Sequence, residues 1–161
     1  MSHSSTQSLR RSLGMFATGV TVVTTRDAEG EPVGLTVNSF NSVSLDPPLI
    51  VWSLSLSLPV RPVFEACTHY AVNVLAADQE AVSRQFASRK PDRFAGMDWH
   101  PGEHDVPLLN GCCANFVLRN THMQPGGDHV VFISEVLWFT RSERDPLLYF
   151  GGAYRGLSPL A

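Results

Sequence analysis

The sequence predicts a mainly β protein with a few helices, arranged as a mostly antiparallel barrel. Several segments of strand composition follow one another through short turns, and only two or three segments have helical character. Neither a G-x-G-x-x-G sequence nor a P-loop occurs in the chain. These observations favour an antiparallel barrel over a doubly wound parallel sheet.

The N-terminal third is predicted to hold a short helix and a β-hairpin. Residues 8–16, SLRRSLGMF, place Leu9, Leu13 and Phe16 on one face of a helix. The β-branched run VTVVTT at 20–25 predicts a strand. The turn-forming DAEGEP and the run VGLTVNSF then complete the hairpin.

The middle of the chain alternates strands with helices. After the break DPP, the apolar run LIVWSL at 49–54 predicts a buried strand. A proline-started segment at 57–67 is compatible with a helix, and YAVNVL at 70–75 returns to strand composition. Residues 76–89 form the clearest amphipathic helix, with Asp78 as its expected cap.

The last part is predicted to be a long loop followed by strands. Residues 90–111 are rich in proline, glycine and charge, and a loop of this length predicts a functional role or a partner surface. CANFVLRNTH, HVVFISEVLWFTR and PLLYFGGAY then have strand composition, and the first two are joined by the turn PGGD.

Length and charge exclude several classes of protein. The 161 residues predict one domain over 1–161, in which 1–15 form an N-terminal helix or extension. The formal charge of −3 is scattered, with no block of like charge to bind nucleic acid or a membrane surface. We therefore expect no nucleic-acid partner and no membrane association.

The cysteines and the N-terminus predict a cytoplasmic protein. Cys67, Cys112 and Cys113 include no C-x-x-C, so neither a disulfide framework nor a thiolate zinc site is expected. The start of the chain lacks the apolar core and cleavage site of a signal peptide, and no stretch approaches about 18 apolar residues.

Two histidine motifs, WHPGEH and PGGDHVV, are candidate metal or ligand sites. His100 and His104 have the spacing of helical metal ligands, but the proline and glycine of WHPGEH remove that helix, so no metal site is expected. In PGGDHVV the turn places His129 at the start of a strand. This histidine either packs at the end of a sheet or points as a donor at a ligand in the barrel mouth.

Two stretches rich in short polar side chains raise a similar choice. GLTVNSFNSVSLDPPLI at 34–50 carries serine, threonine and asparagine between apolar residues, and SLSLSLP at 53–59 places three serines on one face of an extended segment. The first stretch is either a solvated edge with local caps or a wall of donors for a flat ligand. Two such edges favour the ligand.

These residues resemble the flavin reductase-like proteins, split-barrel enzymes that supply reduced flavin to two-component monooxygenases. The resemblance extends from about Phe16 to Gly156, through FATGVTVVTT, GLTVNSFNSVSLDPPLI, the serine segment before PVRPVF, YAVNVLAADQ with QFASRKPDRF, PLLNG, GGDHVV and PLLYFGGAYR. Seven motifs in the same order form a specific signal. The resemblance implies an FMN-binding split β-barrel, antiparallel and Greek-key-like.

The resemblance also implies a set of site residues. Residues 36–44 would line the isoalloxazine and ribityl chain, the serines of 53–57 would form a second edge near the phosphate, and 89–94 would close over the cofactor. His129 matches a histidine associated with the nicotinamide or flavin site, and 154–155 match a motif beside it. The implied cofactor-binding set is Thr36, Asn38, Ser39, Ser42, Ser44, Ser53, Ser55, Ser57, Arg89, Lys90, Phe94, Tyr154 and Arg155.

The activity implied is that of a homodimeric NAD(P)H:flavin oxidoreductase. Either FMN or FAD would be reduced by NADH or NADPH, and the diffusible product would serve a separate monooxygenase acting on an aromatic substrate. Two alternatives stay open: an oxidoreductase with tightly bound flavin, and a module that stores or senses flavin without catalysis. Ser134 replaces a common glycine, and Leu58 with Pro59 replaces a polar or basic pair near the phosphate.

Overall fold

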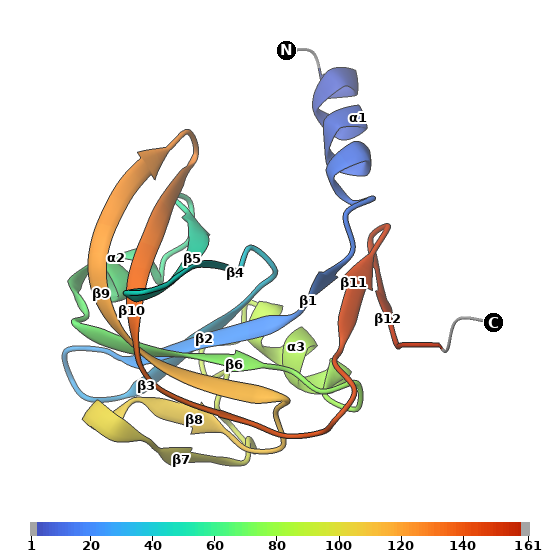
Figure 1. The fold of residues 1–161 in the computed structure, drawn as a ribbon. Helices are drawn as coiled ribbons and strands as arrows, with labels where there is room; N and C mark the ends of the chain where they lie inside the picture. Colours follow the sequence, from blue (N-terminus) through green and yellow to red (C-terminus); the bar gives the residue numbers. More distant parts are fainter. Residues whose placement is uncertain (1–2, 159–161) are drawn as a thin grey trace.

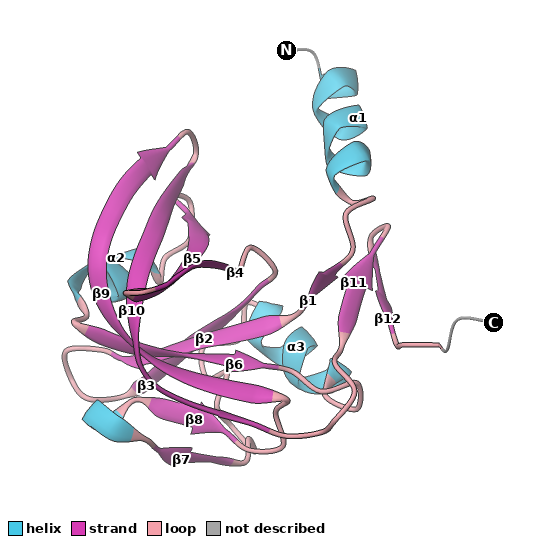
Figure 2. Cartoon of the chain, viewed as in Figure 1, coloured by secondary structure: helices cyan, strands magenta, loops and turns pink. Residues whose placement is uncertain are grey.

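The computed structural model describes residues 3–158 and is drawn in Figure 1. Figure 2 shows that strands dominate the described chain, as the sequence predicts. The helices are α1 (His3–Leu13), α2 (Arg61–Ala66), α3 (Glu80–Ala87) and the 3-10 helix η1 (Glu103–Asp105). The strands are β1 (Thr18–Gly19), β2 (Thr21–Arg26), β3 (Pro32–Val37), β4 (Asn41–Leu45), β5 (Pro48–Ser55), β6 (His69–Val74), β7 (Trp99–Pro101), β8 (Pro107–Leu109), β9 (Ala114–Gly126), β10 (His129–Arg141), β11 (Leu148–Phe150) and β12 (Ala153–Arg155).

The main sheet has seven strands in the order β3-β2-β6-β9-β10-β5-β4, and its neighbouring strands are antiparallel. Its two edge strands, β3 and β4, are consecutive in the chain and are joined only by residues 38–40. Because so short a link holds the edges near one another, the sheet must curl into a barrel. The gap between β3 and β5 is called the seam below.

Strand β5 separates the barrel interior from the seam. Ile50, Trp52 and Leu54 are buried, whereas Ser53 and Ser55, which alternate with them, are only half-buried. The continuous burial predicted for this strand is therefore wrong, because alternate side chains of a strand point to opposite faces.

Aromatic rings fill the interior around Trp52. Its ring stacks on Phe132 with the centroids 4.6 Å apart, and meets Phe64 and Tyr70 edge to face. The Trp52 Nε1–H donates to Tyr70 Oη at 2.8 Å, and that hydroxyl donates to Ser134 Oγ at 2.6 Å. All five side chains are fully buried, so the core contains a closed chain of polar contacts.

Two helix predictions need correction. The first helix ends at Leu13, so Phe16 lies in the segment that leads to β1. The third helix begins at Glu80 after Gln79 and has no side-chain cap, so the capping role predicted for Asp78 is wrong. Asp78 instead forms an ion pair with Arg144, which lies far along the chain and therefore could not be anticipated locally.

The region predicted as a loop at 90–111 contains a small β-hairpin. Strands β7 and β8 pair antiparallel as a separate two-stranded sheet, and η1 lies in their connection. Phe94, before the hairpin, is buried against Phe86 and Trp99. This segment is therefore anchored to the second hydrophobic cluster of the protein.

Helix α3 lies directly against β3 because Gly34 has no side chain. A Cβ added at Gly34 would lie 2.8 Å from Phe86 Cε1 and 3.1 Å from Thr24 Cγ2. Both neighbours are fully buried, so neither can move away easily. Glycine at this position thus permits the close approach of helix and sheet.

Helix α1 extends away from the barrel, as Figure 1 shows. Leu9, Leu13 and Phe16, the predicted apolar face, are 48%, 66% and 75% exposed. The segment after the helix contacts the small sheet through a hydrogen bond from Gly151 N to Gly14 O. Within residues 3–158, no other segment buries the apolar face of α1.

Candidate functional site

Three adjacent cavities follow the seam along β3. The first and second, each of about 210 Å³, share Thr36, Val37 and Asn38. The third, of about 190 Å³, shares Leu58 with the second. Each is smaller than the roughly 300 Å³ at which small-molecule sites begin, so a nucleotide would extend over more than one. The three are called the seam groove below.

Serine side chains hold the middle of the seam groove. Ser53 N donates to Ser39 Oγ at 2.9 Å, and Ser39 Oγ donates to Ser53 O at 3.1 Å. Through this pair, the link between the two sheet edges is fixed to β5. Ser55 Oγ and Ser57 Oγ lie 3.0 Å apart at the end of the same strand. Several predicted donors therefore do converge, and some of their bonding capacity serves the seam itself.

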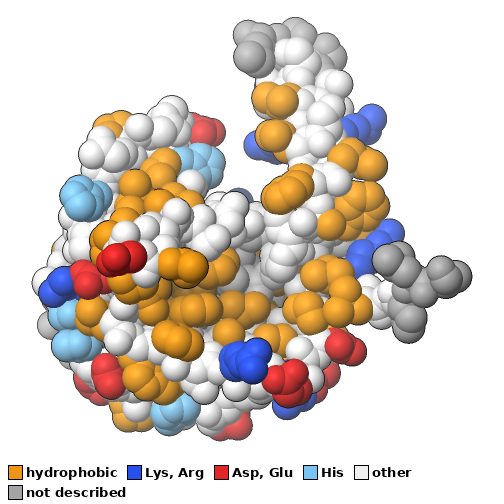
Figure 3. Space-filling model, in the orientation of Figure 1, with side chains coloured by type: hydrophobic (Ala, Val, Ile, Leu, Met, Phe, Trp, Pro, Cys, Tyr) orange, Lys and Arg blue, Asp and Glu red, His pale blue; other side chains and the backbone are white. Residues whose placement is uncertain are grey.

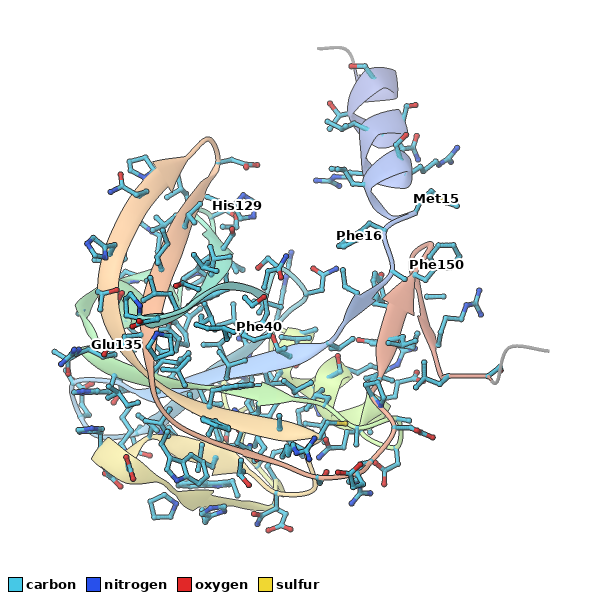
Figure 4. The ribbon with its side chains drawn as sticks, viewed as in Figure 1. Met15, Phe16, Phe40, His129, Glu135 and Phe150 are labelled. Carbon is cyan, nitrogen blue, oxygen red and sulfur yellow. The ribbon has the colours of Figure 1, made fainter. Side chains whose placement is uncertain are left out.

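His129 lies beside these serines, at the start of β10. The two-residue turn before it contains Gly127, whose φ of +69° suits glycine, and Leu56 N donates to Asp128 O at 2.9 Å. His129 pairs with Ser55 in the β5–β10 register and lines the second cavity. Figure 4 shows His129 near the turn of the β9–β10 hairpin.

Asp128 orients the imidazole of His129. His129 Nδ1 and Asp128 Oδ1 are 2.7 Å apart, and this hydrogen bond lowers the pKa of the exposed Asp128 carboxyl below its ordinary value. The carboxylate therefore favours the proton on Nδ1, and Nε2 is the ring nitrogen that remains for another partner. Such an arrangement can bind a polar ligand atom at a defined position.

The first cavity has an aromatic wall. Tyr149 and Tyr154 line it opposite Thr36 and Asn38 of β3. The two rings meet edge to face with their centroids 5.4 Å apart. An aromatic wall facing hydroxyl and amide groups suits a flat ligand with polar edges.

The third cavity contains the basic end of the groove. Lys90 and Arg93 line it together with Pro59 and Val60. Arg93 Nη1 donates to Gly34 O at 2.9 Å, which fixes the guanidinium against β3. Two cations over an apolar floor can hold an anionic group such as a phosphate.

Not every predicted residue lines the seam groove. Ser42 and Ser44 lie on edge strand β4, where Ser44 Oγ accepts a hydrogen bond from Asp46 N. Ser57, Arg89 and Arg155 are exposed and line none of the three cavities. Phe94 lines the third cavity, but only 7% of it is exposed, so it supports the cavity floor from within the core.

Arg93 and Tyr149 are groove residues with polar or aromatic side chains that the sequence did not predict as binding residues. Arg93 stands in the same basic segment as Lys90, and this segment was the signal that could have included it. Tyr149 lies five residues before Tyr154 of the predicted tyrosine-arginine motif and reaches the groove because β11 pairs with β12. Leu58, which the resemblance places near the phosphate as a departure from the family pattern, lines the second and third cavities.

A larger groove, of about 700 Å³, lies elsewhere and is lined by residues of β2, α2 and the turn before β8. His69 and His104 stack there with centroids 3.8 Å apart, and Arg26 pairs with Asp105. Its wall has no convergent row of hydroxyls, so we place the site in the smaller seam groove, where donors, aromatic rings and cations meet.

Other classes of site find little support in the described chain. Within residues 3–158, no three histidine, cysteine or acidic side chains are grouped to hold a metal ion. The three cysteines are unpaired. None of the described helices combines the length and apolarity needed to cross a bilayer.

Known proteins are similar to this chain in sequence and in fold. Residues 13–158 match the family "Flavin reductase like domain". FMN reductase (NADH) SmoA of Agrobacterium fabrum is 45% identical over 148 residues, which cover 92% of this chain and 84% of that protein. The reductase component of the flavin-dependent trigonelline monooxygenase of Acinetobacter baylyi is 42% identical over 91% of this chain, but the match spans only 47% of its own length.

A solved structure gives the same result in three dimensions. The NADH:FAD oxidoreductase SgcE6 of Streptomyces globisporus, in complex with NAD and FAD fragments, superposes with a TM-score of 0.92 at 38% identity. The match covers 99% of this chain and 96% of that one. The predicted split-barrel fold is therefore confirmed, and the chain belongs to the flavin reductase-like domain family.

Proposed function

We propose that this protein is an NADH:flavin oxidoreductase that reduces FMN or FAD and releases the product to a partner monooxygenase. The observation that carries the proposal is the seam groove, in which an aromatic end, a row of hydroxyls with His129 and a basic end are continuous. Relatives named as NADH-dependent FMN or FAD reductases support this activity. Hydride transfer is the chemistry that the two nucleotides supply when both are bound.

The groove residues fit the parts of a flavin. Thr36 and Asn38 border the first two cavities and would contact the polar edge of the isoalloxazine and the ribityl chain. Ser55 and Ser57 would form the second edge, and Lys90 would hold the phosphate with its missed neighbour Arg93. Donors near the ring edge would stabilise the negative charge that reduction creates.

His129 would bind the nicotinamide side of the pair. Its orientation by Asp128 gives it a role of position and charge, with no covalent step. His129→Ala should therefore raise the KM for NADH by about tenfold while changing the flavin Kd much less. Steady-state rates and a flavin titration measure the two effects, and an equal loss of both would contradict the assignment.

The reductase test uses purified full-length protein with FMN, FAD or no added flavin. NADH oxidation that depends on added flavin would support a diffusible-flavin reductase, and the faster flavin would identify the preferred one. Copurified flavin with a rate independent of additions would favour an oxidoreductase with tightly bound flavin. Flavin binding without NADH or NADPH oxidation would contradict the proposal and favour a non-catalytic module.

The partner would be a separate monooxygenase that uses the released flavin on an aromatic substrate. The relative named as a reductase component of a monooxygenase supports such a pairing. A cytoplasmic location would bring both proteins to the same NADH pool. Product formation by the oxygenase should require this protein, flavin and NADH together, and catalase should not abolish it if reduced flavin is the species delivered.

We also propose that residues 1–161 act as one unit in a homodimer. Figure 3 shows hydrophobic side chains along α1 and across the barrel face beside it. Leu45 of β4 is 93% exposed and Phe139 of β10 is 67% exposed, and in Figure 4 Met15 and Phe16 lie where α1 approaches β11. Apolar surface of this extent is typical of a protein contact.

The dimer is tested by light scattering after size-exclusion chromatography. The wild-type protein should have the mass of two chains, and Phe139→Asp should shift it toward one chain, because a charge would be buried at the contact. Val43→Asp, at an exposed apolar position on β4, serves as a second probe of the exposed apolar surface. A wild-type mass of one chain at micromolar concentration would contradict the dimer.

A further inference from the structure

Ser83 is a polar residue whose presence on α3 is not explained by the helix itself. It lies in the middle of Glu80–Ala87 and is fully buried. A serine inside a helix is less favourable than alanine, and a buried hydroxyl requires a partner. Its contacts therefore reveal what it does.

Ser83 connects the two walls of the first cavity. Its Oγ lies 2.8 Å from Tyr154 Oη, and its carbonyl oxygen accepts a hydrogen bond from Thr36 Oγ1 at 2.7 Å. Thr36 and Tyr154 both line that cavity, from β3 and β12. These strands belong to different sheets, so Ser83 is a direct polar link between the barrel and the small sheet.

The ring of Tyr154 is held from several sides. The Arg84 guanidinium carbon lies 4.9 Å from its centroid, and Arg84 is itself paired with Glu80. Tyr149 meets the ring at an interplanar angle of 70°. Because the Tyr154 hydroxyl is bonded to Ser83, any rotation of the side chain that moves the hydroxyl would break that hydrogen bond. Arg84 covers one face of the ring and Ser83 binds its hydroxyl, so the opposite face is what remains for a ligand.

We propose that Ser83 is a positioning residue that holds Tyr154 as the aromatic wall against which the flavin ring stacks. This inference rests on the proposed function, which brings the isoalloxazine to Thr36 and hence to the cavity that Tyr154 closes. The Ser83 hydroxyl acts only through Tyr154. The Thr36 contact uses the backbone carbonyl of Ser83 and persists whatever side chain is present.

The test compares Ser83→Ala, Tyr154→Phe and the double variant in the full-length protein. Each single variant should raise the flavin Kd and KM by about five- to tenfold, since each removes the same hydrogen bond. The double variant should be no worse than either single one. The KM for NADH should change less than about twofold, a split that a general loss of structure would not produce.

Ser88→Ala is the matched control for the helix. Ser88 Oγ donates to Gln85 O at 2.7 Å at the end of α3 and has no bond to Tyr154. This variant should retain the wild-type flavin Kd. If Ser83→Ala fails to fold, Tyr154→Phe alone decides, because its half-buried ring leaves the helix intact.

Two outcomes would overturn the positioning role of Ser83. One is a wild-type flavin Kd in Ser83→Ala or in Tyr154→Phe, and the other is multiplication of the two effects in the double variant. Flavin binding is measured by fluorescence quenching, independently of turnover. A wild-type protein that binds flavin without reducing it would therefore contradict the reductase proposal alone.

Discussion

The inner face and the seam edge of β5 carry two kinds of polar network. On the inner face, Trp52 bonds to Tyr70 and Tyr70 to Ser134, all fully buried. At the seam edge of β5, beside its outward-facing serines, the Ser39 hydroxyl exchanges hydrogen bonds with the backbone N–H and C=O of Ser53, in contact with solvent. The inner network is closed on itself, whereas the outer one keeps capacity for a ligand. A polar residue is thus structural or functional according to whether it lies in the barrel interior or along the seam.

Burial explains why the inner network is structural. It raises the pKa of Tyr70 well above the ordinary value, and so the phenol stays protonated. It can then accept from the indole and donate to the serine at once. Ser134 supplies the final acceptor.

The largest expected effect comes from the inner face. Trp52→Ala should lower the free energy of unfolding by about 3–5 kcal/mol, because it leaves a cavity between Phe132 and Phe64. Val51→Ala, next along the strand but only half-buried, should cost about 1 kcal/mol. Chemical denaturation measures both. Equal losses of unfolding free energy in the two variants would show that the inner face of β5 is no more important for stability than the outer face.

The next largest loss of stability is expected when only the hydrogen bonds of the inner network are removed. Tyr70→Phe should cost about 1–3 kcal/mol, because the Trp52 N–H would be buried without an acceptor. Tyr149→Phe, whose ring lines the groove, should stay within about 0.5 kcal/mol of wild type. A cost for Tyr70→Phe as small as that of the control would show that the network adds no stability.

At the seam edge the expected loss of stability is smaller and a binding effect appears. Ser39→Ala should cost about 1 kcal/mol, since water can replace the lost bonds, and should raise the flavin Kd several-fold. Ser142→Ala also removes a hydroxyl bond to a backbone carbonyl, and neither Ser142 nor its partner Cys112 lines the groove. It should leave the flavin Kd unchanged. An unchanged Kd in Ser39→Ala would exclude that residue from the site.

The smallest expected effect on stability concerns His69, which lies outside both networks in the larger groove. Burial, followed by the charges of His104 and Arg119, lowers the pKa of His69 below its ordinary value of 6.5. Near that pH the unfolded chain then binds more protons at His69 than the folded chain, so stability falls as pH decreases through this range.

His69→Gln should therefore reduce the drop in Tm between about pH 7.5 and about pH 5.5. The variant keeps a polar side chain of similar length beside Thr68, and His104 is retained. An unchanged pH dependence of Tm would show that His69 does not contribute to it.

The regular strands were predictable because their signals are local. The β-branched run before DAEGEP and the PGGD turn specify hairpins from a few adjacent residues. The β7–β8 hairpin was missed because its strands have only three residues and contain prolines. The role of Asp78 was missed because its partner Arg144 is distant in the sequence.

The candidate site was predictable in kind but not in geometry. The serines and His129 were found by composition and resemblance, but their convergence depends on the pairing of His129 with Ser55 across two strands. Such register is set by the whole sheet. Similarly, nothing local to Ser83 indicates that it joins Thr36 to Tyr154.

Because Gly34 has no side chain, α3 can lie close to β3, and this distance determines the width of the seam groove. Thr36, two residues along the same strand, is bonded to α3, and Arg93 is bonded to the Gly34 carbonyl. A methyl group at residue 34 would push the helix outward through Phe86 and would move both groove ends together. The width of the seam groove is therefore set in part by the missing side chain at residue 34.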